Sequence, residues 1–155
     1  MKKLVAFLFA SIVFVIAGCD MVIDQHTVPT PWVKGFEKEN ANVLKVGITT
    51  KDEISQYFMK KLGAGGLMPS EVWPCGSYSC ALNKIGAGVE HKRGFLGLGT
   101  YPVYRMVYLI FPDGVDTLAG YQMIEDYRDG TQVQVGGQTD DQVIAEVSKL
   151  LAQKK

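Results

Sequence analysis

The residues that could carry chemistry are three cysteines, Cys19, Cys75 and Cys80, and two histidines, His26 and His91. Four residues separate Cys75 from Cys80, whereas the two cysteines of a redox pair are usually separated by two. A metal site would need further ligands, and neither histidine has the cysteine or carboxylate neighbours that are typical of zinc sites. For the pair itself, a structural disulfide, free thiols and, least supported, a metal site remain open.

The first cysteine follows a segment that has the layout of a secretory signal. Lys2 and Lys3 give a positive start, and residues 4–17 form an apolar run in which Ser11 is the only polar residue. This run is too short to cross a bilayer, because a spanning helix needs about 20 apolar residues. The small residues directly before Cys19 indicate cleavage there, and the alternatives are an uncleaved anchor helix or an ordinary signal.

The segment Val15-Ile16-Ala17-Gly18-Cys19 resembles the lipobox of bacterial lipoproteins, in which an aliphatic residue and two small residues precede a cysteine. The resemblance implies that residues 1–18 are a signal peptide that is removed. It also implies a diacylglycerol on the Cys19 thiol and an acyl chain on its new amino group, and no other cofactor is expected. Two or more acyl chains hold a protein firmly on a membrane, here facing the periplasm.

The residue after the lipidated cysteine indicates the membrane in which a lipoprotein is retained. In enteric bacteria an aspartate at this position resembles a signal that keeps lipoproteins in the inner membrane. Asp20 therefore implies the inner membrane.

The amino-acid composition argues against nucleic acid as a partner. The chain has 16 basic and 16 acidic residues, so it lacks the basic surplus that nucleic-acid binding requires. Removal of the signal leaves roughly 135 residues, which is the size of one domain. An even pair of cysteines in an exported domain favours a disulfide, so we predict a bond between Cys75 and Cys80.

The mature chain divides into a tether, residues 19–42, and a single α+β domain, residues 43–155. The tether is polar, contains Pro29 and Pro31, and shows neither a helical nor a strand period. Trp32 and Phe36 are its large apolar residues, and we expect them to dock its end onto the domain.

Two capping boxes predict the helices of the domain. Thr50 is followed by Glu53 three residues later, and an apolar face at helical spacing continues to Leu62. Thr139 and Gln142 have the same relation at the start of a C-terminal helix.

A three-stranded antiparallel meander is predicted between these helices and packs against them. Its strands are rich in β-branched and aromatic residues and are separated by two Asp-Gly turns. We expect a bulge at Gly120. The glycine-rich region 63–99 has no strong period and is expected to be irregular or partly built from short strands, one of them at residues 79–82. The three predicted strands are residues 103–111, 118–127 and 131–135.

Two surfaces are candidates for contact with a partner. Phe95, Leu96 and Leu98 lie in an apolar, glycine-containing loop, which either folds onto the domain or contacts a protein or bilayer. A free edge of the meander is able to accept a strand from a partner.

No catalytic motif is present. No nucleophile elbow surrounds Ser77 or Ser79, and Asp113 and Asp116 lack the other ligands of a calcium loop. We therefore expect a protein that is not an enzyme and that has no metal and no small-molecule substrate.

The segment Gly47–Ile54 (GITTKDEI), the lipobox and the Asp113-Gly114 turn resemble the small lipoproteins of the SmpA/OmlA type. Those proteins attach to the outer-membrane barrel-assembly machinery. The resemblance implies two helices packed on an antiparallel sheet, a binding role without catalysis, and an outer-membrane location, opposite to what Asp20 implies. We expect an accessory subunit of a cell-envelope assembly with a protein partner, or alternatively a small periplasmic enzyme or an inhibitor of one.

Overall fold

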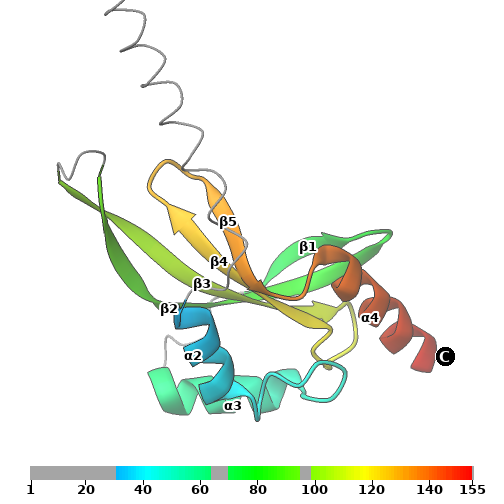
Figure 1. Ribbon diagram of the computed structural model, residues 1–155. Coiled ribbons are helices and arrows are strands. Elements are labelled where there is room, and N and C mark those ends of the chain that lie inside the picture. The colour runs from blue at the N-terminus through cyan, green and yellow to red at the C-terminus, as the bar shows by residue number, and fades with distance from the viewer. Residues whose placement is uncertain (1–30, 64–69, 95–98, 155) are drawn as a thin grey trace, which may run out of the picture.

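The computed structural model describes residues 31–63, 70–94 and 99–154, and these form an antiparallel sheet with helices on both faces (Figure 1). The five strands are adjacent in space in the order in which they follow one another along the chain. Helices α2 (Pro31–Asn40) and α3 (Lys51–Leu62) lie on one face, and α4 (Asp140–Gln153) covers one end of the other. The strands are β1 (Glu71–Cys75), β2 (Tyr78–Arg93), β3 (Thr100–Pro112), β4 (Gly120–Tyr127) and β5 (Gln132–Gly137).

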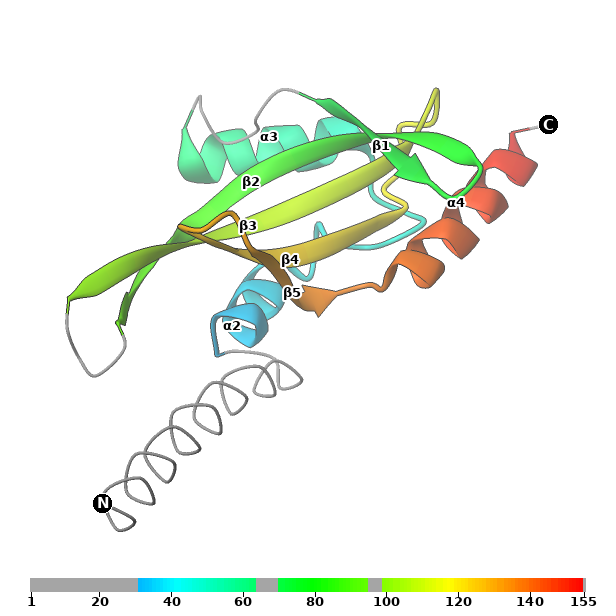
Figure 2. The ribbon, with the colours of Figure 1, turned by 90° about the horizontal axis from the view of Figure 1, so that it is seen from above.

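Alternation along β3 separates two cores, because successive side chains of a strand point to opposite faces. Leu109 and Phe111 belong to the core under α2 and α3, together with Ile54 and Phe58 of α3. Ile110 lies between them in sequence and belongs to the core under α4. Viewed from above, the β2–β3 hairpin extends beyond the rest of the sheet (Figure 2).

The α+β class is confirmed, but the count of three strands is wrong, because the sheet has five. The region expected to be irregular contains β1 and the long strand β2, which includes the short strand expected at residues 79–82. β2 was not predicted as a long strand, because the alternation of its side chains between the two faces of the sheet is broken by a register shift between Gly86 and Gly88. Pairing along β3 holds this glycine-rich strand extended.

The expected tether also contains structure, since Pro31–Asn40 forms α2. This corrects the expected start of the domain at residue 43. Proline is well placed at the first helical position, because the amide it lacks would have no helical partner there. Trp32 and Phe36 pack against the core as expected, and Val33 is only 1% exposed. Ten residues with so few buried positions give too weak a period to predict a helix from sequence.

Both predicted capping boxes are present. The Thr50 amide donates to Glu53 Oε2 at 2.8 Å, and the Glu53 amide donates to Thr50 Oγ1 at 3.3 Å. The equivalent bonds between Thr139 and Gln142 are 3.0 and 3.4 Å long. Local hydrogen bonds therefore begin both helices where the sequence predicts.

Two glycines allow helices to approach the sheet closely. A Cβ at Gly120 would lie 2.6 Å from Val143 of α4, and one at Gly136 would lie 2.5 Å from Val33 of α2. The bulge expected at Gly120 is absent, and the register shift of β4 falls between Met123 and Ile124 instead. Gly120 is therefore required for helix packing.

Candidate functional site

The cysteine pair forms the predicted disulfide. Cys75 and Cys80 are bonded, with their Cα atoms 6.1 Å apart, and both are fully buried. They flank the β1–β2 turn and lie in the core under α4. Ile144 of α4 also lies close to this turn, 3.4 Å from where a Cβ of Gly76 would be. The pair is therefore a structural crosslink at the end of the sheet that α4 covers.

The other predicted site residues lie outside the described part of the chain. These are Cys19 and Asp20 at the N-terminus and the loop residues 95–98, which include Phe95, Leu96 and Leu98. The residues that border this loop are described: the Gly94 amide donates to the Gly99 carbonyl at 3.1 Å, at the end of the β2–β3 hairpin. The roles expected of these residues remain predictions.

A buried carboxylate connects the first turn of α2 to the sheet. Glu125 of β4 is 1% exposed and accepts hydrogen bonds from Trp32 Nε1 at 3.0 Å, Lys92 Nζ at 2.8 Å and Tyr127 OH at 2.9 Å. Burial alone would raise the pKa of this carboxyl, but hydrogen bonds from Lys92, Trp32 and Tyr127 outweigh it and hold the pKa below its ordinary value. We call these four residues the tether junction.

Two further charged residues border the tether junction. The Arg105 guanidinium lies 5.5 Å from the centre of the Trp32 ring and forms an ion pair with Glu90 at 2.5 Å. Cation–π contacts of this kind add to the attachment of Trp32. The contacts of this cluster with Trp32 hold the first turn of α2 against the sheet.

The expected free edge of the meander is β5. It is the last strand of the sheet and pairs with β4 alone among the described strands. The opposite edge strand, β1, contains Pro74, which has no amide proton to offer a partner strand. In contrast, β5 (QVQVGG) contains neither proline nor a charged residue, the usual devices that block an edge. β5 is therefore the edge better suited to accept a strand.

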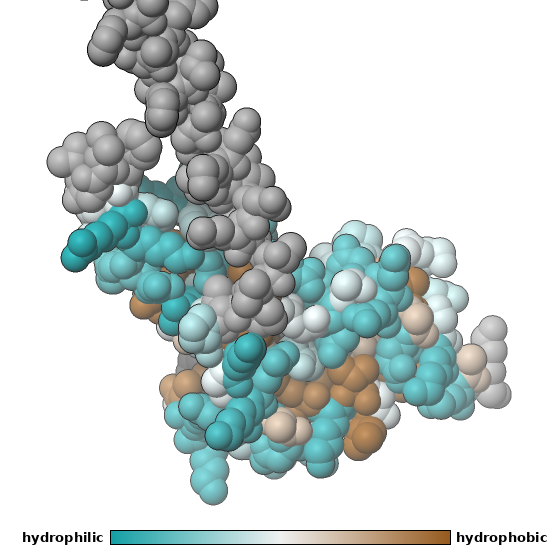
Figure 3. Space-filling view, viewed as in Figure 1, coloured by the Kyte–Doolittle hydropathy of each residue, from teal (hydrophilic) through white to brown (hydrophobic). Residues whose placement is uncertain are grey.

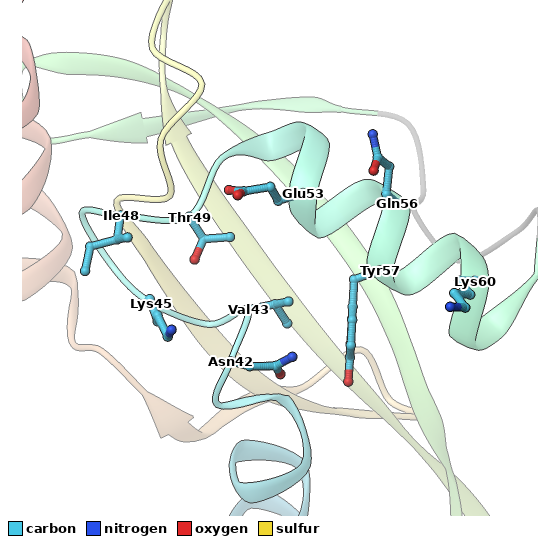
Figure 4. Close-up of a pocket in the computed structure, with 9 residues that line it drawn as sticks. All are labelled: Asn42, Val43, Lys45, Ile48, Thr49, Glu53, Gln56, Tyr57 and Lys60. Carbon is cyan, nitrogen blue, oxygen red and sulfur yellow. The ribbon is translucent and has the colours of Figure 1, made fainter.

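A groove lies between α3 and the loop that joins α2 to α3 (Figure 4). Its volume is about 450 Å³. Figure 4 shows Asn42 and Val43 pointing from the loop toward Tyr57 of α3, with Ile48 at one end and Lys60 at the other. We call this the α3 groove, and it is lined by Asn42, Val43, Lys45, Ile48, Thr49, Glu53, Gln56, Tyr57 and Lys60.

Charge in the α3 groove is positive. Its lining has one acid, Glu53, whose carboxylate is occupied by the amide and hydroxyl of Thr50 at 2.8 and 2.9 Å. The backbone hydrogen bond from Thr50 is the main reason that the pKa of Glu53 is lowered. Lys45 and Lys60 take part in no ion pair within residues 31–63, 70–94 and 99–154. Among the described residues, neither of these two lysine charges at the groove has an ion-pair partner.

Sequence reasoning missed this groove. Residues 43–48 form turns and irregular backbone, which leave Val43 buried and Ile48 70% exposed. Figure 3 shows apolar surface, coloured brown, beside the loop that joins α2 to α3, with hydrophilic surface around it. An isoleucine two residues before the capping Thr50 gives no sign of this exposure in the sequence.

Among the described residues, no group of three or more His, Cys, Asp and Glu side chains could hold a metal ion. No helix within those residues is long and apolar enough to cross a membrane. The sequence matches no family model, and neither a curated protein nor a solved structure matches it.

Proposed function

We propose that this protein is a lipoprotein that faces the periplasm and serves as a non-catalytic binding subunit of a cell-envelope assembly. The observation that carries the proposal is the segment Val15–Cys19 at the end of a short apolar run. In the bacterial lipoproteins that this segment resembles, the cysteine thiol at this position receives the diacylglycerol. Acyl chains would then supply the membrane attachment.

The distance between anchor and domain supports this proposal. Only residues 20–30 separate Cys19 from α2, and at full extension they span about 40 Å. The tether junction fixes the start of α2 to the sheet, so the domain would stay within that distance of the bilayer. Confinement raises the effective concentration of the domain toward partners in the same membrane.

Two features of the surface favour a binding role over catalysis. The free edge of β5 offers backbone groups to a partner strand, and the α3 groove offers a preformed cleft. The buried charged cluster at the tether junction is occupied in holding α2.

Lipidation is tested by intact-mass analysis of the protein extracted from membranes. We expect loss of residues 1–18 and added acyl mass, and we expect Cys19→Ala to abolish both. The matched control is Cys75→Ser with Cys80→Ser, which removes the disulfide and leaves the acyl mass unchanged. A soluble product with an unmodified Cys19 would end the proposal.

Separation of inner and outer membranes then decides between two expectations. Asp20 favours the inner membrane, and the resemblance to SmpA/OmlA-type lipoproteins favours the outer membrane. Asp20→Ser is the discriminating variant, because it removes the retention signal. Movement of the variant from the inner to the outer membrane would support sorting by Asp20.

The binding role is tested by formaldehyde crosslinking in intact cells followed by mass spectrometry. A reproducible envelope-protein partner supports the proposal. Recovery of no partner, together with a hydrolytic activity in the purified chain, would instead favour the alternative of a small periplasmic enzyme.

A further inference from the structure

We propose that the α3 groove binds an acidic segment of the partner protein, with Lys45 and Lys60 pairing with its carboxylates. This inference rests on the proposed function because it assumes a protein partner in the envelope. It goes further by naming the binding surface and the chemistry of the segment that fits it.

The positions of the two lysines carry the argument. Lys45 extends from the loop wall of the groove and Lys60 from the α3 wall, so a segment in the groove would lie between two positive charges (Figure 4). Neither lysine has a carboxylate partner within 4.0 Å among the described residues, whereas Lys61, the neighbour of Lys60, is paired with Glu39 at 3.3 Å. Unpaired charge on both walls favours an anionic occupant by complementarity.

The only acid of the lining does not cancel this charge. Glu53 Oε2 accepts from both the amide and the hydroxyl of Thr50, so its carboxylate is oriented toward the helix cap. The Lys45 charge contributes to lowering the pKa of Glu53 but forms no direct ion pair with it. A partner carboxylate would therefore meet two available ammonium groups and one occupied acid.

The remaining lining suits a peptide. Val43 and Tyr57 give the groove apolar walls, and the side-chain amide of Asn42 can pair with a peptide backbone. Ile48 lies at one end and is 70% exposed, which offers an apolar side chain of the partner a place to pack. The volume of about 450 Å³ is within the range of ligand pockets, about 300–1,000 Å³.

Backbone hydrogen bonds hold the loop wall in this shape. The Gly47 amide donates to the Leu118 carbonyl at 2.8 Å, and the Leu118 amide donates to the Thr49 carbonyl at 2.9 Å. On the opposite wall, Tyr57 OH donates to the Glu39 carbonyl at 3.3 Å. The groove is thus formed before binding, which lowers the entropic cost of association.

The experiment is carbodiimide crosslinking of membranes that contain the full lipidated chain, because this reagent joins lysine amines to carboxylates in direct contact. We expect crosslinks from Lys45 or Lys60 to an aspartate or glutamate of an envelope protein, identified by mass spectrometry. Lys45→Gln with Lys60→Gln should reduce the yield at least tenfold. Lys34→Gln with Lys38→Gln is the matched control, because both lysines are exposed on α2 and lie outside the groove.

Four results would overturn the proposal. The first is crosslinks from Lys45 and Lys60 to Glu53 or other residues of the same chain only. The second is a link to a second copy of this chain. The third is the absence of any link to a protein, which is the result expected if the groove binds an anionic lipid instead. The fourth is a formaldehyde-linked partner that persists in the Lys45→Gln, Lys60→Gln variant. This result would overturn binding of the partner at the groove and leave the proposed function standing. An unlipidated Cys19 overturns the proposed function instead.

Discussion

The replacement Glu125→Gln tests whether the tether junction holds α2 on the sheet. The carboxylate is buried and accepts three hydrogen bonds, at 3.0 Å from Trp32, 2.8 Å from Lys92 and 2.9 Å from Tyr127. Glutamine has nearly the same shape and keeps one acceptor oxygen for Trp32. Its amide group, however, donates hydrogen at the position where Lys92 and Tyr127 also donate, so both lose this acceptor, and Lys92 keeps the Tyr127 hydroxyl, to which it donates at 3.0 Å.

The structure sets the size of the effect. Removal of one partner from a buried ion pair costs about 3–5 kcal/mol, and a hydrogen bond to a charged group contributes about 1.5–3 kcal/mol. The Lys92 side chain is 29% exposed, so its ammonium can turn toward water and offset part of the loss. We therefore expect the free energy of unfolding to fall by about 2–4 kcal/mol.

Urea unfolding at pH 7 measures this change in the mature chain carrying Cys19→Ala, with the disulfide intact. The matched control is Asp126→Asn on the same strand, because Asp126 points to the opposite face and its side chain, among the described residues, accepts one hydrogen bond, from Gln132 at 3.3 Å. We expect the control to change the free energy of unfolding by less than about 0.5 kcal/mol. Equal unfolding midpoints for wild type and Glu125→Gln would refute the reasoning.

The effect should also depend on pH. The pKa of Glu125 is lower in the folded protein than its ordinary value of 4.5, so the folded state favours the charged form. This stabilisation is fully present above pH 4.5 and is lost as the pH falls through the folded-state pKa. The difference between wild type and Glu125→Gln should therefore shrink in acid. A difference that stays constant to the lowest pH would show that shape, rather than charge, causes it.

Four further replacements test the remaining elements by urea unfolding. Gly35→Ala should stabilise the protein by about 0.4–1 kcal/mol, because a Cβ at this position of α2 meets nothing within 4 Å; destabilisation would show that α2 is not helical there. Thr50→Ala should cost about 1 kcal/mol through loss of the α3 cap, and no loss would contradict the capping box. Leu150→Ala should cost about 2–4 kcal/mol, and a change near zero would place α4 outside the core. Cys75→Ser with Cys80→Ser should cost about 2 kcal/mol, and thiol labelling of the denatured, unreduced wild type should detect neither cysteine.

Elements with a local cause could be predicted from the sequence. The capping boxes at Thr50 and Thr139 each join residues three positions apart, so the pattern contains the hydrogen bonds that begin each helix. The Asp129-Gly130 turn and the alternation of β3 are local in the same sense. The cysteine pair was also predictable, because a short loop brings its ends together without help from distant residues.

In contrast, α2, the strand β2 and the α3 groove depend on contacts between distant parts of the chain. The Trp32–Glu125 hydrogen bond joins residues 93 positions apart, and no local pattern encodes it. β2 is extended because β3 pairs with it, although its own glycines favour irregular backbone. The α3 groove exists because Leu118, far along the chain, holds the loop before α3 in place. Contacts between distant residues contribute to folding only once the whole chain is compact, so the sequence pattern could not show them.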